Sequence, residues 1–97
     1  MLREYEIIYI IDPDLEEEAV TATVDRFSQL AASQGAEVVN IDRWEKRKLA
    51  YEIKNKREGI YVVMELRAQP AAIAELDRVF KITDSVLRHM TVRKDGK

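Results

Sequence analysis

The stretch EYEIIYII, residues 4–11, decides the fold expected for this chain. Its β-branched and aromatic residues favour a strand, and successive side chains of a strand point to opposite faces. Positions 5, 7, 9 and 11 put apolar or aromatic side chains on one face, while Ile8 and Ile10 make the second half of the other face apolar too. A segment that is apolar on both faces is typical of the interior of a sheet, and so we expect a central strand.

The next segment, DPDLEEE at residues 12–18, predicts the start of a helix. Asp12 or Asp14 can cap a helix, and Pro13 suits its first turn. Gly35 is the residue type that commonly follows the last turn. Between these signals runs an apolar stripe at helical spacing, made of Val20, Val24, Phe27 and Ala31.

A long β-hairpin is predicted from about Glu37 to Leu66, because two extended apolar segments flank a polar one. The polar segment KNKREG, residues 54–59, is the predicted turn. After it, Pro70 begins a second helix with apolar residues on one face, and TDS at 83–85 ends it. The last strand is VLRHMTVRK, residues 86–94, where simple alternation places Val86, Arg88, Met90 and Val92 on one face.

The order strand, helix, strand, strand, helix, strand predicts an α+β ferredoxin-like sandwich (βαββαβ) in one domain, residues 1–97. Its four-stranded antiparallel sheet has the order 4-1-3-2 and carries both helices on one face. A chain of 97 residues can bury one hydrophobic core. The absence of cysteine excludes disulfides and thiolate chemistry. We expect no signal peptide and no membrane span, and hence a cytoplasmic protein.

The face of the sheet without helices is predicted to carry apolar side chains. If the odd positions of the first strand meet the helices, then Ile8, Ile10, Tyr61 and Val63 lie on the uncovered face. Exposed apolar clusters of this kind usually mark a binding surface. The alternative is a mixed face that is simply solvated.

Charge is distributed unevenly along the chain. Residues 1–40 carry two basic side chains against nine acidic ones, a net charge of −7, whereas residues 41–97 carry fourteen against nine, a net charge of +5. Seven basic and only two acidic residues lie between Arg43 and Arg57. A local cationic surface of this kind can contact phosphates, although a scattered solvated surface is the alternative.

Catalysis has little support in the residue pattern. His89 is the only histidine and has no serine, aspartate or metal-ligand spacing around it. Asp12 and Asp14 are better explained as helix-capping residues, and no glycine-rich phosphate loop is present. We therefore expect no enzymatic activity, no cofactor, no metal site and no small-molecule substrate.

RNA binding has more support. Basic residues interleaved with Trp44, Tyr51 and Tyr61 have the composition of an RNA contact, since cations reach phosphates and aromatic rings stack on unpaired bases. The antiparallel pairing of the first and last strands also places Arg3 near Arg93 and Lys94. A second cationic group is thus expected at the other side of the sheet.

The chain resembles the bacterial small-subunit ribosomal protein six family over nearly its whole length. The stretch RWEKRKLAYEI, residues 43–53, followed by EGIYVVMEL, residues 58–66, carries the resemblance, and RKLAY at 47–51 with the closing strand is its most specific part. Two positions depart from the family pattern, because Glu45 and Glu52 stand where the family has glycine and proline. The remaining matches are Tyr5, Glu6, Pro13, Asp84, Val86, Arg88 and Met90.

The resemblance implies a ferredoxin-like fold and a structural role in the small ribosomal subunit. It implies binding to the central domain of small-subunit ribosomal RNA together with ribosomal protein eighteen. We expect this partner protein on the uncovered face or at the edge of the second strand. An alternative of another class is a self-associating regulatory module that binds a small ligand. The residues expected to contact RNA are Arg3, Arg47, Lys48, Tyr51, Lys54, Arg88, Arg93 and Lys94.

Overall fold

The computed structural model describes residues 2–94 and has the predicted order of elements. No helix in this range is both long and apolar enough to cross a membrane. The elements are β1 (Arg3–Ile11), α1 (Glu17–Ser33), β2 (Glu37–Ile53), β3 (Lys56–Ala68), α2 (Pro70–Ile82) and β4 (Val86–Arg93).

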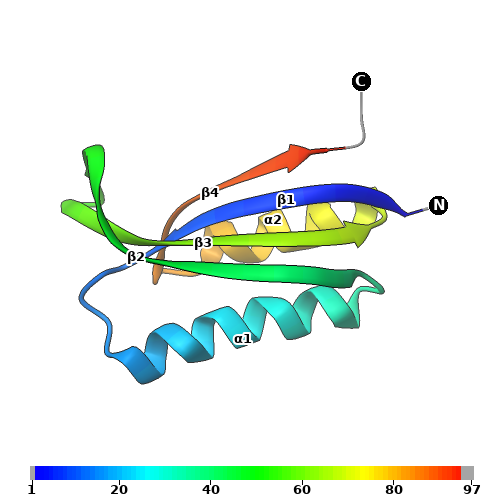
Figure 1. Ribbon diagram of the computed structural model, residues 1–97, viewed down its shortest axis with the longest axis horizontal. Helices are drawn as coiled ribbons and strands as arrows, with labels where there is room; N and C mark the ends of the chain where they lie inside the picture. The colour runs from blue at the N-terminus through cyan, green and yellow to red at the C-terminus, as the bar shows by residue number, and fades with distance from the viewer. Residues whose placement is uncertain (1, 95–97) are drawn as a thin grey trace.

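The four strands form one antiparallel sheet in the order β2-β3-β1-β4, which is the predicted order (Figure 1). β1 pairs with β3 along its whole length, from Arg3 opposite Ala68 to Ile11 opposite Ile60. Both helices pack on one face of the sheet and leave the other face open. The ferredoxin-like sandwich is therefore confirmed.

An aromatic cluster joins the sheet to both helices. The ring centroid of Tyr9 on β1 lies 5.4 Å from that of Phe27 on α1 and 4.9 Å from that of Phe80 on α2. The two phenylalanine rings stack with centroids 4.0 Å apart. All three side chains are fully buried, and aromatic pairs of this geometry add to the energy of burying their area. The predicted core face of β1, with Tyr5, Ile7, Tyr9 and Ile11, is confirmed.

Helix α1 begins later than the sequence predicts. The backbone N–H of Asp14 donates to Oδ1 of Asp12 over 2.9 Å, which closes a local turn before the helix. The helix then starts at Glu17 after Glu16, which makes no side-chain capping bond. The prediction of a cap at Asp12 or Asp14 is thus wrong, because the Asp12 carboxylate is used by the turn. The apolar stripe and the role of Gly35, whose φ is +84°, are confirmed.

The turn of the β2–β3 hairpin is shorter than predicted. Lys54 and Asn55 have φ values of 50° and 67°, and positive φ at both central residues defines the tight two-residue turn that matches strand twist. Residues 56–59 already belong to β3. The prediction of a turn over 54–59 is wrong because residues 56–59 extend the strand instead, with Arg57 and Glu58 exposed on it.

A β-bulge near the start of β4 sorts its side chains between the two faces. Ile11 pairs with Val86, but the adjacent Ile10 pairs with Arg88, so Leu87 is the additional residue. Val86 consequently packs in the core while Arg88 faces the open side. Simple alternation, which placed Val86 and Arg88 on the same face, is wrong here. Helix α2 begins at Pro70 and buries its apolar face as predicted.

The hydroxyl of Tyr9 provides a test of the core. It is buried without a hydrogen-bond partner among the described residues. Burial, and then the nearby Asp25 carboxylate, raise the pKa of Tyr9 far above its usual range. A buried hydroxyl without a partner destabilises the fold, and so Tyr9→Phe should raise the free energy of unfolding by about 1 kcal/mol, measured by urea denaturation.

Tyr51→Phe is the matched control, because the Tyr51 hydroxyl is exposed and bonded to Arg88. It should bring no gain in stability. A loss of stability in Tyr9→Phe would show that the Tyr9 hydroxyl makes a favourable bond in solution.

Candidate nucleic-acid interface

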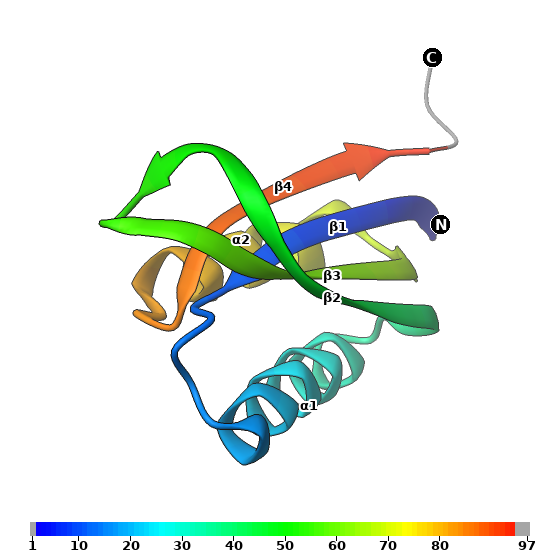
Figure 2. The ribbon, with the colours of Figure 1, turned by 60° about the vertical axis from the view of Figure 1, so that its left-hand side comes forward.

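The end of the β2–β3 hairpin bends over the open face of the sheet (Figure 2). β2 and β4 are opposite edge strands, separated by β3 and β1. Even so, Arg88 of β4 donates to the hydroxyl of Tyr51 on β2, and Nζ of Lys54 donates to the carbonyl of Val86 over 3.1 Å. These contacts require the hairpin to cross both inner strands. The bend therefore joins the two edges of the sheet.

Two irregularities in β2 accompany this bend. The register with β3 shifts between residues 43 and 46 and again between residues 48 and 53. Such irregularities bend a strand and increase its twist. Glu45 and Glu52, which stand where the resemblance predicts glycine and proline, lie within these two intervals. Outside the turn, no described residue other than glycine has a positive φ, so the first irregularity does not need a glycine at position 45.

Gly59 permits a close approach within the hairpin. A Cβ atom at this position would lie 2.2 Å from Cγ2 of Ile10 and 3.5 Å from Cδ2 of Leu49. The Ile10 side chain thus fills the space above the glycine. This contact explains why a glycine precedes the aromatic residue of β3.

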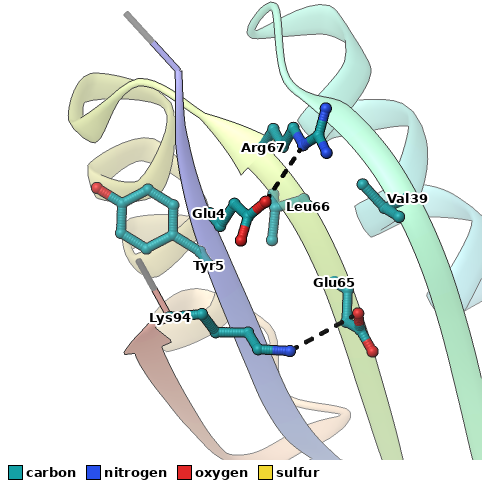
Figure 3. A pocket seen from close by; sticks show the side chains of 7 residues that line it. All are labelled: Glu4, Tyr5, Val39, Glu65, Leu66, Arg67 and Lys94. Atoms are coloured by element: carbon teal, nitrogen blue, oxygen red, sulfur yellow. Dashed lines mark ion pairs between the residues drawn. The ribbon is translucent and has the colours of Figure 1, made fainter. Parts of the chain in front are cut away.

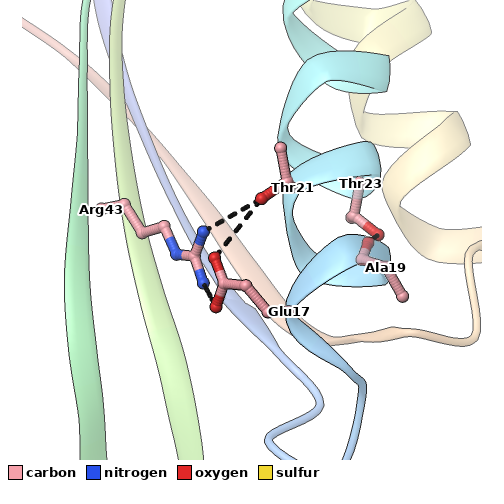
Figure 4. Close-up of polar contacts among 5 residues, drawn as sticks. All are labelled: Glu17, Ala19, Thr21, Thr23 and Arg43. Carbon is pink, nitrogen blue, oxygen red and sulfur yellow. Dashed lines mark hydrogen bonds and ion pairs between the residues drawn. The ribbon is translucent and has the colours of Figure 1, made fainter.

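Several basic side chains of the hairpin are engaged within the protein. Arg43 donates to Oε1 of Glu17 over 2.7 Å and to the hydroxyl of Thr21 over 3.3 Å, which ties β2 to α1 (Figure 4). The hydrogen bond from Arg43 holds the pKa of Glu17 below its usual range. Arg43 is therefore committed to the fold rather than presented to a ligand.

The base of the turn uses two further cations. Lys56 pairs with Asp14 and, over 3.5 Å, with Asp12, so it fastens the hairpin to the loop before α1. Arg57 pairs with Glu52 across the hairpin over 3.2 Å. The carboxylate at position 52 thus neutralises one cation of the segment.

The cations that remain available are consecutive. Lys46, Arg47 and Lys48 are exposed and form no ion pair with the described residues. Arg47 lies opposite Gly59 and Lys48 opposite Glu58, so neighbouring side chains of this group leave opposite faces of the strand. The guanidinium carbon of Arg47 lies 4.8 Å from the ring centroid of Trp44.

Arg88 extends this cationic group across the sheet. Its guanidinium carbon lies 6.0 Å from the ring centroid of Tyr51, in addition to the bond to the tyrosine hydroxyl. The Tyr51 side chain stays 60% exposed. Five of the expected RNA contacts thus lie on the bent hairpin or on the part of β4 that it reaches, although Lys54 uses one of its donors on Val86. The five are Arg47, Lys48, Tyr51, Lys54 and Arg88.

The other three expected contacts lie at the opposite end of the sheet. Arg93 pairs with Tyr5, and the N–H of Lys94 donates to the carbonyl of Glu4, close to Arg3. Arg93 lies five positions after Arg88 along the strand, about 17 Å at ~3.3 Å per residue. Nζ of Lys94 lies 3.8 Å from a carboxylate oxygen of Glu65, as Figure 3 shows beside a second pair between Glu4 and Arg67. The expected second cationic group therefore includes acidic neighbours.

The open face carries the predicted apolar residues, but they are less exposed than expected. Ile10 and Val63 are only 7% and 9% exposed, because neighbouring side chains cover them. Ile8 and Tyr61 are half-buried and line a hollow of about 220 Å³ with Ile10 and Met90. Met90, which also lines this hollow, is 49% exposed. Other strand residues with exposed apolar side chains are Val39, Trp44, Tyr51 and Val92.

His89, the candidate catalytic residue of the sequence, has a structural role. Nε2 of His89 lies 3.3 Å from the Asp77 carboxylate and its ring stacks 5.0 Å from that of Phe80, so this histidine packs between β4 and α2. Among residues 2–94, no group of three or more histidine and carboxylate side chains could hold a metal ion. The arrangement is suited to binding an anionic polymer.

Sequence reasoning did not select two of the residues in this group. Trp44 and Lys46 were not among the expected contacts, since alternation alone does not bring Trp44 beside Arg47. The irregularity between residues 43 and 46 shifts the register and allows it. The interleaving of basic and aromatic residues was the available signal.

Known proteins match this chain over nearly its whole length. Residues 4–93 match the model of the family described as Ribosomal protein S6. The small ribosomal subunit protein bS6 of Desulforamulus reducens is 54% identical over 96% of this chain and 98% of its own length.

Solved structures give the same result. The crystal structure of 30S ribosomal protein S6 from Thermotoga maritima superposes with a TM-score of 0.92 at 30% identity, covering 97% of this chain and 89% of that one. The C-terminal domain of the MgtC protein from Mycobacterium tuberculosis superposes with a TM-score of 0.70 at 14% identity over the same fractions. This second similarity shows a shared fold alone.

Replacing Gly59 tests the close approach that seats the hairpin. Gly59→Ala should lower the free energy of unfolding by about 1–3 kcal/mol, because the new methyl group overlaps the Ile10 side chain. The added cost of the alanine should fall when it is combined with Ile10→Ala, which removes the clashing atoms. Denaturation of both single variants and the double variant measures this coupling, and strictly additive effects would contradict the contact.

The contact of Lys56 with Asp14 predicts a dependence on pH. The hydrogen bond from Lys56, and then its charge, lower the pKa of Asp14. A carboxyl group with a lowered pKa in the folded state stabilises the fold above its unfolded pKa of about 3.9, and this stability is lost as the pH falls through the folded value. Lys56→Met should therefore lower the urea midpoint at neutral pH and flatten its decline below about pH 4.

Lys81→Met is the control for charge, since Lys81 is exposed at the end of α2. It should keep the acid-side decline of the parent chain. If Lys56→Met keeps that decline too, the contact with Asp14 does not affect stability.

Proposed function

Because the chain belongs to the ribosomal protein S6 family, we propose that it binds the central domain of small-subunit ribosomal RNA together with ribosomal protein eighteen. The family is a structural component of the small ribosomal subunit, which agrees with the expected location on the cytoplasmic ribosome. Its role there is assembly rather than catalysis.

The observation that carries the RNA contact is the division of labour among the cations of the hairpin. Arg43, Lys56 and Arg57 are paired with carboxylates, whereas Lys46, Arg47 and Lys48 are exposed without such partners among the described residues. In RNA, cationic side chains of this kind donate hydrogen bonds to phosphate oxygens. We assign the primary phosphate contact to this group together with Arg88.

The cations at the other end of the sheet make a secondary contact in this proposal. Arg3, Arg93 and Lys94 lie on or beside the paired ends of β1 and β4. Lys94 shares its charge with Glu65, which weakens its attraction to phosphate. RNA that spans both ends would have to follow the open side of β4.

The partner protein is assigned to the hollow on the open face. Ile8 and Tyr61 expose part of their apolar surface there beside Ile10, and Val63, which pairs with Ile8, lies on the same face. Acidic residues of β1 and β3, Glu4, Glu6 and Glu65, follow along the same face. A partner with basic residues beside an apolar segment fits this chemistry, and the net charge of −7 over residues 1–40 favours its approach.

Arg47→Ala and Arg88→Ala test the phosphate contact. Each should weaken binding to the central-domain RNA roughly tenfold and reduce the magnitude of the salt slope by about 1, because each removes one charge-assisted contact. The measurement is RNA affinity at several salt concentrations, with and without ribosomal protein eighteen.

Arg78→Ala is the matched control, because Arg78 lies on α2 and is paired with Glu75 over 2.7 Å. It should leave affinity and salt slope unchanged. Unchanged binding by Arg47→Ala and Arg88→Ala would remove these residues from the interface. A stable homodimer that binds no RNA would instead support the self-associating regulatory module.

A further inference from the structure

We propose that Trp44 and Arg47 form a stacking platform for one unpaired nucleobase of RNA. This inference rests on the proposed function and specifies the chemical group that the hairpin receives. The ligand is a base from a single strand, loop or bulge, because a paired base in a duplex exposes no face for stacking.

The geometry brings three planar groups together. The Arg47 guanidinium carbon lies 4.8 Å from the ring centroid of Trp44. The Trp44 ring in turn stacks on Tyr61 of β3, with centroids 6.0 Å apart and planes inclined by 23°. Guanidinium planes and aromatic rings are the surfaces on which proteins stack unpaired bases. This cluster therefore offers a base a planar surface for stacking, which a lone lysine does not provide.

The platform is preorganised. Nε1 of Trp44 donates to Oδ2 of Asp42 over 2.9 Å, which fixes the direction of the indole from the same strand. The Trp44 side chain nevertheless stays 38% exposed despite its contacts with Tyr61 and Arg47. A ring that is already held in place loses little conformational freedom when a ligand stacks on it. Asp42 is a positioning residue in this arrangement.

The charges around the platform suit a nucleotide rather than a neutral ring. Arg47 has no ion-pair partner among the described residues, so its N–H groups remain available while its plane stacks. Lys46 and Lys48 flank it in sequence and are exposed. A base on the platform would thus have cations beside it for the adjoining phosphates.

Trp44 is the single tryptophan of the chain and reports directly on stacking. We expect single-stranded oligoadenylate to change the tryptophan fluorescence in a saturable manner. An abasic phosphodiester chain of the same length, which keeps the phosphates and lacks the bases, should bind more weakly and leave the fluorescence unchanged. A duplex of the same length should also leave it unchanged.

Arg47→Lys tests the planar guanidinium group separately from its positive charge. It keeps the positive charge and loses the planar group, and so it should weaken oligoadenylate binding about tenfold while the salt slope stays the same. Arg78→Lys is the matched control, because it makes the same change on α2, away from the hairpin, and it should bind like the parent chain. Trp44→Leu should lose a similar factor, measured by fluorescence anisotropy of labelled oligoadenylate, and thermal unfolding of each variant checks that it is folded.

Three results would overturn the platform. These are equal responses to oligoadenylate and to the abasic chain, unchanged affinity in Arg47→Lys, and a fluorescence change on adding ribosomal protein eighteen but none with oligoadenylate. The last result would assign Trp44 to the protein partner. If salt-dependent binding to the central-domain RNA persists in any of these cases, the proposed function stands and only the platform fails. Absence of that binding would contradict the proposed function itself.

Discussion

The aromatic cluster of Tyr9, Phe27 and Phe80 is the interaction on which the rest of the structure depends. It joins β1 to both helices, which commits them to the same face of the sheet. Ile8 and Ile10 of β1 are then left on the face without helices. An open face with apolar residues at its centre is therefore a direct consequence of the way the core is packed.

β2 extends beyond the part of the sheet that the helices support. This extension covers part of the open face. The distal half of β2 bends over the inner strands and reaches β4 through Tyr51 and Lys54. Gly59 permits this arrangement, because a residue without a side chain leaves space for the Ile10 side chain. The hairpin thus covers Ile10 while the hollow beside Tyr61 stays accessible.

The division of charges within the hairpin connects its structure with its proposed function. Cations near the ends of the bent segment hold it in position through Glu17, Asp14 and Glu52. Those in its middle have no such partners among the described residues and face solvent. A cationic group held by its own fold is preorganised for phosphates, since binding then orders little additional chain. The apolar hollow proposed for the partner protein lies on the open face, over which the hairpin bends.

The sequence by itself determined the order of elements, the strand order, the core face of β1 and the stripe of α1, because periodicity reports directly on which side chains meet the core. It was less accurate where local chemistry competed. The Asp12 carboxylate closed a turn instead of capping α1, and the hairpin turn needed two residues rather than six. The sequence also places the run of basic residues in a hairpin, where the structure has it.

Only the tertiary structure decided which of those cations remain available and what surrounds them. The bulge at Leu87 brings Arg88 to the open face, and the irregularity beside Glu45 brings Trp44 against Arg47. Both depend on register, which a single extra residue in a strand reverses from one face to the other. Alternation in the sequence cannot reveal such a residue, since the bulge is set by how the strand pairs with its neighbour.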